Sequence, residues 1–107
     1  MSSVEATLAA LADPHRRRVV ELLRQGPRPA GELAREVGLA PPAMSRALRS
    51  LKAAGLVADS HPQHDARLRI YELRSAPMSE LRAWLEETES LWADQLTALK
   101  AHIEAER

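Results

Sequence analysis

The sequence predicts a mainly α-helical domain with one small β-hairpin, and three observations lead to this fold class. Four segments before residue 55 carry apolar residues at helical spacing. Two short apolar-rich segments around a polar loop follow them, as in a hairpin. A helical pattern without a breaker then runs to the C-terminus. Since the chain has 107 residues, we expect residues 1–107 to form a single domain.

The first two helices are predicted by apolar spacing and by a capping signal. Three apolar residues at helical spacing predict the first helix: Val4, Leu8 and Leu11. Asp13 followed by Pro14 is typical of the N-cap and the first position of a helix. The basic turn at residues 15–18 could contact phosphate or be merely solvated. Because Gly26-Pro27 cannot continue a helix, the second helix is expected to end there.

Glycine and proline bound the third and fourth helices. The third begins near Pro29 or Ala30 and ends at Gly38. Pro41-Pro42 can open a helix but cannot lie in its middle, so the fourth helix is expected from there to about Ala54. The short segment 38–40 then forms a tight turn between two helices.

A hairpin and a long helix complete the predicted chain. Residues 56–58 and 68–73 are the expected strands, and residues 61–66 form the polar loop between them. Residues 78–106 continue as one helix of 29 residues, which spans about 43 Å. The resulting order, α-α-α-α-β-β-α, is that of a winged helix-turn-helix.

Charge is distributed unevenly, although the net charge is zero. Residues 1–75 hold 12 Lys and Arg against 8 Asp and Glu, whereas residues 76–107 hold 3 against 7. This asymmetry suggests a basic working surface and an acidic region turned away from it, with chance clustering on solvated faces as the alternative. The absence of cysteine excludes a disulfide scaffold, a thiolate nucleophile and a cysteine-based metal site.

We expect a cytoplasmic protein that is not an enzyme and contacts no membrane. The N-terminus lacks the basic start and apolar stretch of a secretory signal. No apolar run approaches the roughly 20 residues that a membrane span needs. No glycine-rich phosphate loop, nucleophile elbow or metal-plus-carboxylate motif is present.

In a winged helix-turn-helix, the fourth helix of this chain would be the recognition helix. Met44, Leu48 and Leu51 fall at i, i+4 and i+7 and are expected to face the core. The other face carries small residues and cations that could contact DNA: Pro42, Ala43, Ser45, Arg46, Arg49 and Lys52. Arg67 and Arg69 flank the hairpin loop, where phosphate or minor-groove contact is expected. The alternative is a charged face that is only solvated.

The C-terminal helix, residues 77–106, is expected to form a homodimer. Its apolar stripe needs a partner that one chain cannot fully supply: Leu81, Leu85, Trp92, Leu96, Leu99 and Ile103. Val4, Leu8 and Leu11 of the first helix are expected to join this interface. Trp84 and Trp92 could line a pocket for an unknown small-molecule effector, and the alternative is that they are packed interface core.

Several motifs carry a family resemblance. They are Leu11-Ala12-Asp13-Pro14-His15-Arg16-Arg17, Gly31-Glu32-Leu33-Ala34, Pro42-Ala43-Met44-Ser45-Arg46 and residues 48–57. Over about residues 8–73 the chain resembles the ArsR-type winged-helix regulators, and Trp84-Leu85-Glu86 with Trp92 resembles a metal-free branch of them. The resemblance implies a dimeric repressor, with the first and last helices at the dimer interface and the fourth helix in the major groove of double-stranded DNA. Two-fold symmetry predicts an inverted-repeat operator. The alternative function is a helical dimerisation or protein-interaction module that kept the fold without DNA binding.

The sequence departs from the family pattern at three places. Ala40 stands where the family often has serine, which is a better N-cap. Pro41 and Ala47 stand where glutamine and histidine are common, so two base-reading groups are missing. The loop 61–66 lacks the usual glycine and is a few residues longer, so it could contact DNA differently.

No physiological metal and no other cofactor is expected. The family's metal-binding thiolates would fall at residues 33–35, where Leu-Ala-Arg cannot ligate. The last helix has His102 and Asp94 but no matching histidine for the family's zinc site. His61, His64 and Asp65 could bind zinc or nickel adventitiously, but a structural site needs about four ligands. A plain polar loop is the alternative for these three residues.

Overall fold

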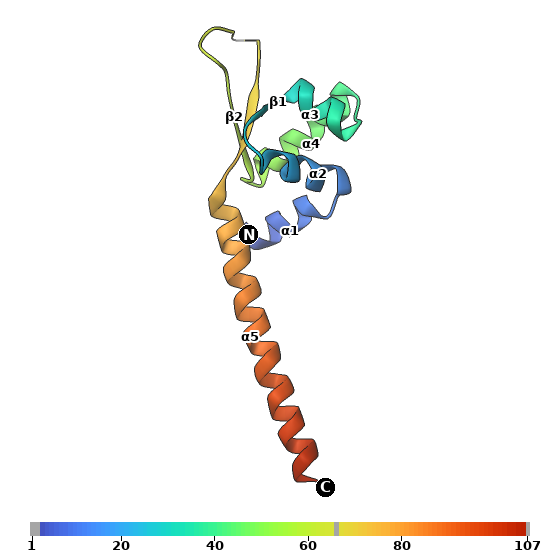
Figure 1. Cartoon of the computed structure of the whole chain (residues 1–107), viewed down its shortest axis with the longest axis vertical. Coiled ribbons are helices and arrows are strands. Elements are labelled where there is room, and N and C mark those ends of the chain that lie inside the picture. The colour runs from blue at the N-terminus through green and yellow to red at the C-terminus, as the bar shows by residue number, and fades with distance from the viewer. Residues whose placement is uncertain (1–2, 66, 107) are drawn as a thin grey trace.

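The computed structural model describes residues 3–65 and 67–106 (Figure 1). The elements follow one another in this order: α1 (Ser3–Leu11), α2 (Pro14–Leu23), β1 (Arg28–Pro29), α3 (Ala30–Val37), α4 (Pro41–Ala53), β2 (Val57–Ser60), β3 (Ile70–Leu73) and α5 (Ser75–Ala105). The predicted fold class, mainly helical with a small antiparallel sheet and a long C-terminal helix, is confirmed. No helix in the described part of the chain is both long enough and apolar enough to cross a membrane.

The capping signal predicted at the start of α2 is present. The Asp13 carboxylate accepts a hydrogen bond of 3.0 Å from the backbone N–H of Arg16, and this bond lowers the pKa of the Asp13 carboxyl. The Arg16 side chain in turn donates to the carbonyls of Ala10 at 2.7 Å and Ala9 at 3.1 Å. These carbonyls lie in the last turn of α1, where few intrahelical donors remain. Arg16 therefore ties the end of α1 to the start of α2.

α3 and α4 are joined by the predicted tight turn. Gly38 ends α3 with a φ of 81°, in the left-handed region that favours glycine, and its N–H donates to the carbonyl of Ala34. α4 begins at Pro41, after an N-cap residue, Ala40, that forms no side-chain capping bond. The departure from serine at position 40 thus leaves this helix without a side-chain cap.

The sheet has three strands, where the sequence predicts two. Its order is β1-β3-β2, and β3 is antiparallel to both neighbours. Arg28 pairs with Tyr71 and Pro29 with Ile70. The prediction missed β1, because a strand of two residues shows no alternation. The predicted start of the third helix near Pro29 or Ala30 is confirmed, since α3 begins at Ala30. Proline is tolerated here because β1 is an edge strand.

The two hairpin strands are displaced from their predicted bounds. β2 starts at Val57 and extends to Ser60, and β3 starts only at Ile70. Leu68, which was expected in the second strand, lies in the loop, with its carbonyl oxygen 3.2 Å from His61 Nδ1. Ala66, part of the expected loop 61–66, lies outside the described residues.

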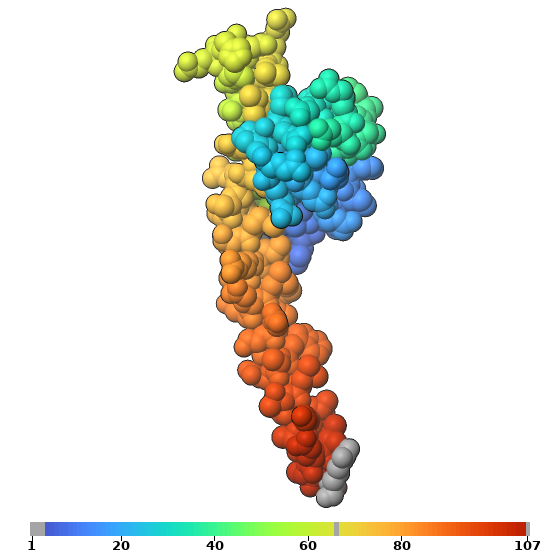
Figure 2. All heavy atoms as spheres, viewed as in Figure 1, coloured from blue at the N-terminus to red at the C-terminus, as the bar shows by residue number. Residues whose placement is uncertain are grey.

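α5 begins at Ser75, ahead of the predicted start at residues 77–78. Pro77 lies in the first turn, where backbone N–H groups have no intrahelical acceptor, so the missing N–H of proline costs no hydrogen bond. The 31 residues of α5 extend well beyond the other elements (Figures 1 and 2). With α5 included, the molecule measures 72 Å along its long axis and 26 × 25 Å across it.

The hydrophobic core lies between α2, α3, α4 and the sheet. Its fully enclosed side chains come from all of these elements: Val19, Leu33, Met44, Leu48, Leu51, Leu56 and Val57. α1 packs beside the first part of α5 (Figure 1). Among the described residues of α5, only Pro77 and Leu81 are buried. Most of this long helix therefore contributes nothing to the core of its own chain.

Candidate nucleic-acid interface

α4 has one buried face and one exposed face. Met44, Leu48 and Leu51 are buried, as predicted, and Ala47 is buried beside them. Position 47, where the family often has histidine, therefore faces the core and offers no group to a ligand. The residues predicted to contact DNA lie elsewhere on the helix: Pro42, Ser45, Arg46, Arg49 and Lys52 are exposed and Ala43 is half-buried.

Arg46 and Arg49 lie one turn apart on the exposed face. Neither guanidinium has an ion-pair or hydrogen-bond partner among residues 3–65 and 67–106. A guanidinium without an internal carboxylate keeps its N–H donors available for a guanine edge or a phosphate.

Lys52 and Arg69, in contrast, share one carboxylate. Lys52 Nζ lies 2.6 Å from one oxygen of Asp59, and a terminal nitrogen of Arg69 lies 2.9 Å from the other. The Asp59 side chain is only 10% exposed. The hydrogen bond from Lys52, followed by the charges of Lys52 and Arg69, lowers the pKa of the Asp59 carboxyl, although burial acts in the opposite direction. Asp59 therefore ties the end of α4 to β2 and to the residue that immediately precedes β3.

Asp59 is a residue that the sequence analysis missed. It comes from β2, whereas Lys52 comes from α4 and Arg69 immediately precedes β3. The three lie together because Asp59 pairs in register with Tyr71, two residues beyond Arg69. The sequence carries little signal for it, because Asp59 lies just beyond the predicted strand 56–58 and before the predicted loop 61–66.

Arg67 lies near the end of the hairpin loop, and its side chain is 97% exposed. It lies 3.8 Å from the Asp65 carboxylate, a loose contact that solvent screens. In the basic turn of α2, Arg16 is occupied by its bonds to α1, whereas Arg17 is exposed and forms no ion pair within the described residues. Of the arginines in that turn, Arg17 is thus better placed than Arg16 to reach a phosphate.

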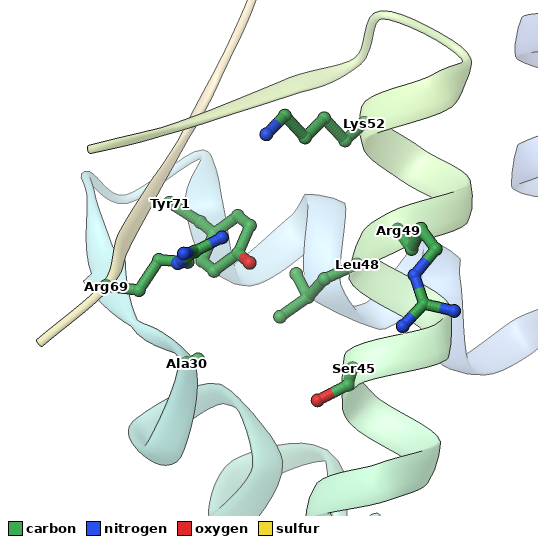
Figure 3. Close-up of a pocket in the computed structure, with 7 residues that line it drawn as sticks. All are labelled: Ala30, Ser45, Leu48, Arg49, Lys52, Arg69 and Tyr71. Carbon is green, nitrogen blue, oxygen red and sulfur yellow. The ribbon is translucent and has the colours of Figure 1, made fainter. Parts of the chain in front are cut away.

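A hollow of about 390 Å³ separates α4 from β3 (Figure 3). Its lining comes from the start of α3, from α4 and from the strand side: Ala30, Ser45, Leu48, Arg49, Lys52, Arg69 and Tyr71. Four of the predicted DNA-binding residues, Ser45, Arg49, Lys52 and Arg69, therefore border one hollow. Arg46 lies outside it, beside a smaller hollow of about 190 Å³ that includes His15 at the start of α2.

The predicted interface residues of α5 differ in exposure. Leu81 is buried within its own chain. The others are half-exposed: Leu85 51%, Trp92 60%, Leu96 57%, Leu99 54% and Ile103 47%. On α1, Leu8 is exposed, whereas Val4 and Leu11 are half-buried and Leu11 packs against the core.

The positions considered for metal binding hold no cluster. Leu33 and Ala34 are buried in the core and carry no ligand atom. Within the described ranges, no three His, Cys, Asp or Glu side chains come together in a way that could hold an ion. His61 is instead positioned beside the carbonyl of Leu68.

Comparison with known proteins agrees with this geometry. A family model described as a helix-turn-helix domain matches residues 11–59, the segment from the end of α1 to β2. The HTH-type transcriptional regulator Rv2034 of Mycobacterium tuberculosis is 38% identical over 97 residues, which make up 91% of this chain and 85% of that protein.

Solved structures extend the likeness to the whole fold. An ArsR-like transcriptional regulator from Rhodococcus sp. RHA1 has a TM-score of 0.79 at 26% identity, covering 92% of this chain and 90% of that one. A possible transcriptional regulator for arsenical resistance has a TM-score of 0.68 at 35% identity, covering 94% and 95%. The predicted resemblance is confirmed: the chain belongs to the ArsR family of winged helix-turn-helix transcriptional regulators.

Proposed function

We propose that the chain is a repressor that binds double-stranded DNA sequence-specifically as a homodimer, with α4 in the major groove. The observation that carries this proposal is the exposed face of α4, where Arg46 and Arg49 have no partner within the described residues. The small side chains of Pro42, Ala43 and Ser45 at the start of α4 leave room for close approach to base edges.

The remaining predicted residues fit contacts to the DNA backbone. Lys52 and Arg69 border the hollow beside α4, and Arg67 extends from the loop. Cations at such flanking positions neutralise phosphates and set the orientation of the protein on the duplex, whereas contacts to base edges give sequence preference. We therefore assign sequence preference to Arg46 or Arg49 and backbone binding to Lys52, Arg67 and Arg69.

The exposed stripe of α5 supports dimerisation. Large apolar side chains in a continuous row are unusual on the surface of a monomer, and they mark an interaction site. A second copy of α5 would cover Leu85, Trp92, Leu96, Leu99 and Ile103, and Val4 and Leu8 lie on α1, which packs beside the first part of α5. Leu81 is buried and Leu11 packs against the core of its own chain, so these two side chains would lie behind the interface residues rather than contact the partner extensively.

A two-fold dimer makes a specific prediction about the operator. Two copies of α4 should enter successive major grooves, so the operator should be an inverted repeat with half-sites about 10 bp apart or a multiple of that. Such a regulator works beside the chromosome, so we place it in the cytoplasm. Trp84 and Trp92 remain the residues that would face a small-molecule effector between the α5 helices.

The deciding experiment is selection of bound duplexes from a random DNA pool, with the full chain and with two variants. The double variant Arg46→Ala/Arg49→Ala removes the free cations of α4. Arg82→Ala is the matched control, because Arg82 is an exposed arginine on α5 that pairs with Glu86 at 3.0 Å. We expect the parent and Arg82→Ala to enrich the same inverted repeat and the double variant to enrich none. If the parent enriches no duplex, the protein-interaction module becomes the better account.

A further inference from the structure

The hollow between α4 and β3 is built from two sides. Ser45, Arg49 and Lys52 are spaced i, i+4 and i+7, so they follow one face of α4. Arg69 and Tyr71 are two residues apart along extended chain, so their side chains leave the same side of the strand. Figure 3 shows both of them directed toward α4, with Leu48 between.

Tyr71 is the one buried polar side chain of this lining. It is 8% exposed, and its ring belongs to the hydrophobic core. Its hydroxyl points across the hollow toward α4 (Figure 3) and has no hydrogen-bond partner among the described residues. The hydroxyl oxygen itself is not enclosed, since the buried side-chain oxygen without a partner in the described part of the chain is that of Thr7. The Tyr71 hydroxyl is therefore open to the hollow, and its O–H can donate to an acceptor that enters there.

The charges of the lining indicate which kind of ligand the hollow would bind. Arg49 has no partner within residues 3–65 and 67–106, and Lys52 and Arg69 together hold the single carboxylate of Asp59, so the surroundings carry more positive than negative charge. Among the residues that the structure describes, no acidic side chain lines the hollow itself. Hydroxyl and cationic donors without an acidic acceptor disfavour a metal ion and suit an oxyanion, because phosphate oxygens accept hydrogen bonds and carry negative charge.

We propose that this hollow binds one phosphate group, which accepts a hydrogen bond from the Tyr71 hydroxyl and is neutralised by Arg49 together with Lys52 and Arg69. In the DNA complex the group is a backbone phosphate beside the major groove, and this form of the proposal rests on the proposed function. A free phosphate ester has the same chemistry and is the second source. Asp59 is then a positioning residue, because it holds two of the cations at the edge of the hollow.

Tyr71→Phe tests the site, since it removes the hydroxyl and keeps the ring in the core. The full chain and the variant are titrated with the selected operator and with an unrelated duplex at several salt concentrations. We expect Tyr71→Phe to weaken binding about 10-fold on both duplexes, because a phosphate contact carries no sequence information. Its salt dependence should match the parent, whereas Arg49→Ala should reduce the slope by about 0.9.

The control is Ser90→Ala, which removes an exposed hydroxyl from α5, far along the chain from the hollow. This variant should bind both duplexes like the parent. Thermal unfolding of Tyr71→Phe checks that the core is intact. Equal DNA affinity of Tyr71→Phe and the parent, with no response to phosphate in the titration below, would overturn the proposal.

A second titration separates the two sources. Isotope-labelled protein without DNA is titrated with inorganic phosphate and with glucose 6-phosphate, and the amide signals of Ser45, Lys52 and Tyr71 are followed. Shifts absent from Tyr71→Phe, together with competition against the duplex, assign the site to a free ester. A Tyr71→Phe defect on DNA without such shifts assigns it to the backbone. If the parent binds no duplex, the proposed function fails, and this titration alone decides whether the hollow binds phosphate.

Discussion

Trp92→Ala is the substitution that should most clearly weaken the proposed homodimer. Trp92 is 60% exposed in one chain and lies in the middle of the α5 stripe, with Leu85 before it and Leu99 after it. Since each residue of an α-helix advances by about 100°, these three side chains fall within about 40° of one another on α5. Removing the indole should therefore leave a gap at the centre of the interface while sparing the core of each chain.

The magnitude follows from the exposed part of the side chain. A packed tryptophan buries about 150–250 Å², so an exposed fraction of 60% leaves about 90–150 Å² per protomer for a partner to cover. At about 25 cal/mol/Å², this corresponds to about 2–4 kcal/mol. Two protomers could double the figure, but interface side chains keep some exposure and lose mobility on association. We expect association to weaken by about 2–4 kcal/mol, or about 30- to 900-fold in Kd.

Sedimentation equilibrium over a dilution series measures this change. Asp94→Ala is the matched control, because Asp94 is exposed and lies about 200° around α5 from Trp92, on the opposite side. The control should dissociate at the parent's concentration, and both variants should keep the parent's helical circular dichroism. A parent that sediments as a stable monomer at micromolar concentration, or a Trp92→Ala variant with the parent's Kd, would refute this reasoning.

Three further predictions follow from the described contacts. The pKa of Asp59 is lowered in the folded chain, so the contribution of this carboxylate to stability is present above the ordinary pKa of 3.8 and is lost as pH falls through the folded pKa. The difference in melting temperature between the parent and Asp59→Asn should therefore be constant near neutral pH and shrink below about pH 4. A difference that grows on acidification would contradict the ion-pair assignment. Gly38→Ala should destabilise the chain by about 1 kcal/mol in urea unfolding, because the φ of 81° is unfavourable for alanine although its Cβ would meet no atom; equal stability would show that the turn relaxes. Excess zinc or nickel should leave operator affinity unchanged, and a stoichiometric metal with metal-dependent affinity would overturn this expectation.

The parts of the fold that were predictable are specified by neighbouring residues. Asp13 and Pro14 mark the start of α2, and Gly38 marks the end of α3, because capping and left-handed turns depend on residues a few positions apart. The division of α4 into a core face and an exposed face follows from helical spacing alone. Local chemistry therefore sufficed for the helix-turn-helix unit.

The features that were missed depend on contacts between distant parts of the chain. β1 exists because Arg28 and Pro29 pair with a strand that begins at Ile70. The double ion pair of Asp59 and the hollow that Tyr71 shares with α4 likewise join separate elements. Residue spacing carries no signal for such contacts, because they arise only after the elements pack together.

The central claim is that the exposed face of α4 reads DNA sequence, and one measurement tests it most directly. Arg46→Ala, Arg49→Ala and Arg67→Ala are each titrated against a panel of single-base operator variants at several salt concentrations. At least one α4 variant should lose about 1–3 kcal/mol in a way that depends on the base, whereas Arg67→Ala should weaken all duplexes alike and reduce the salt slope by about one unit. If Arg46→Ala and Arg49→Ala both bind every operator variant as the parent does, α4 does not recognise the operator.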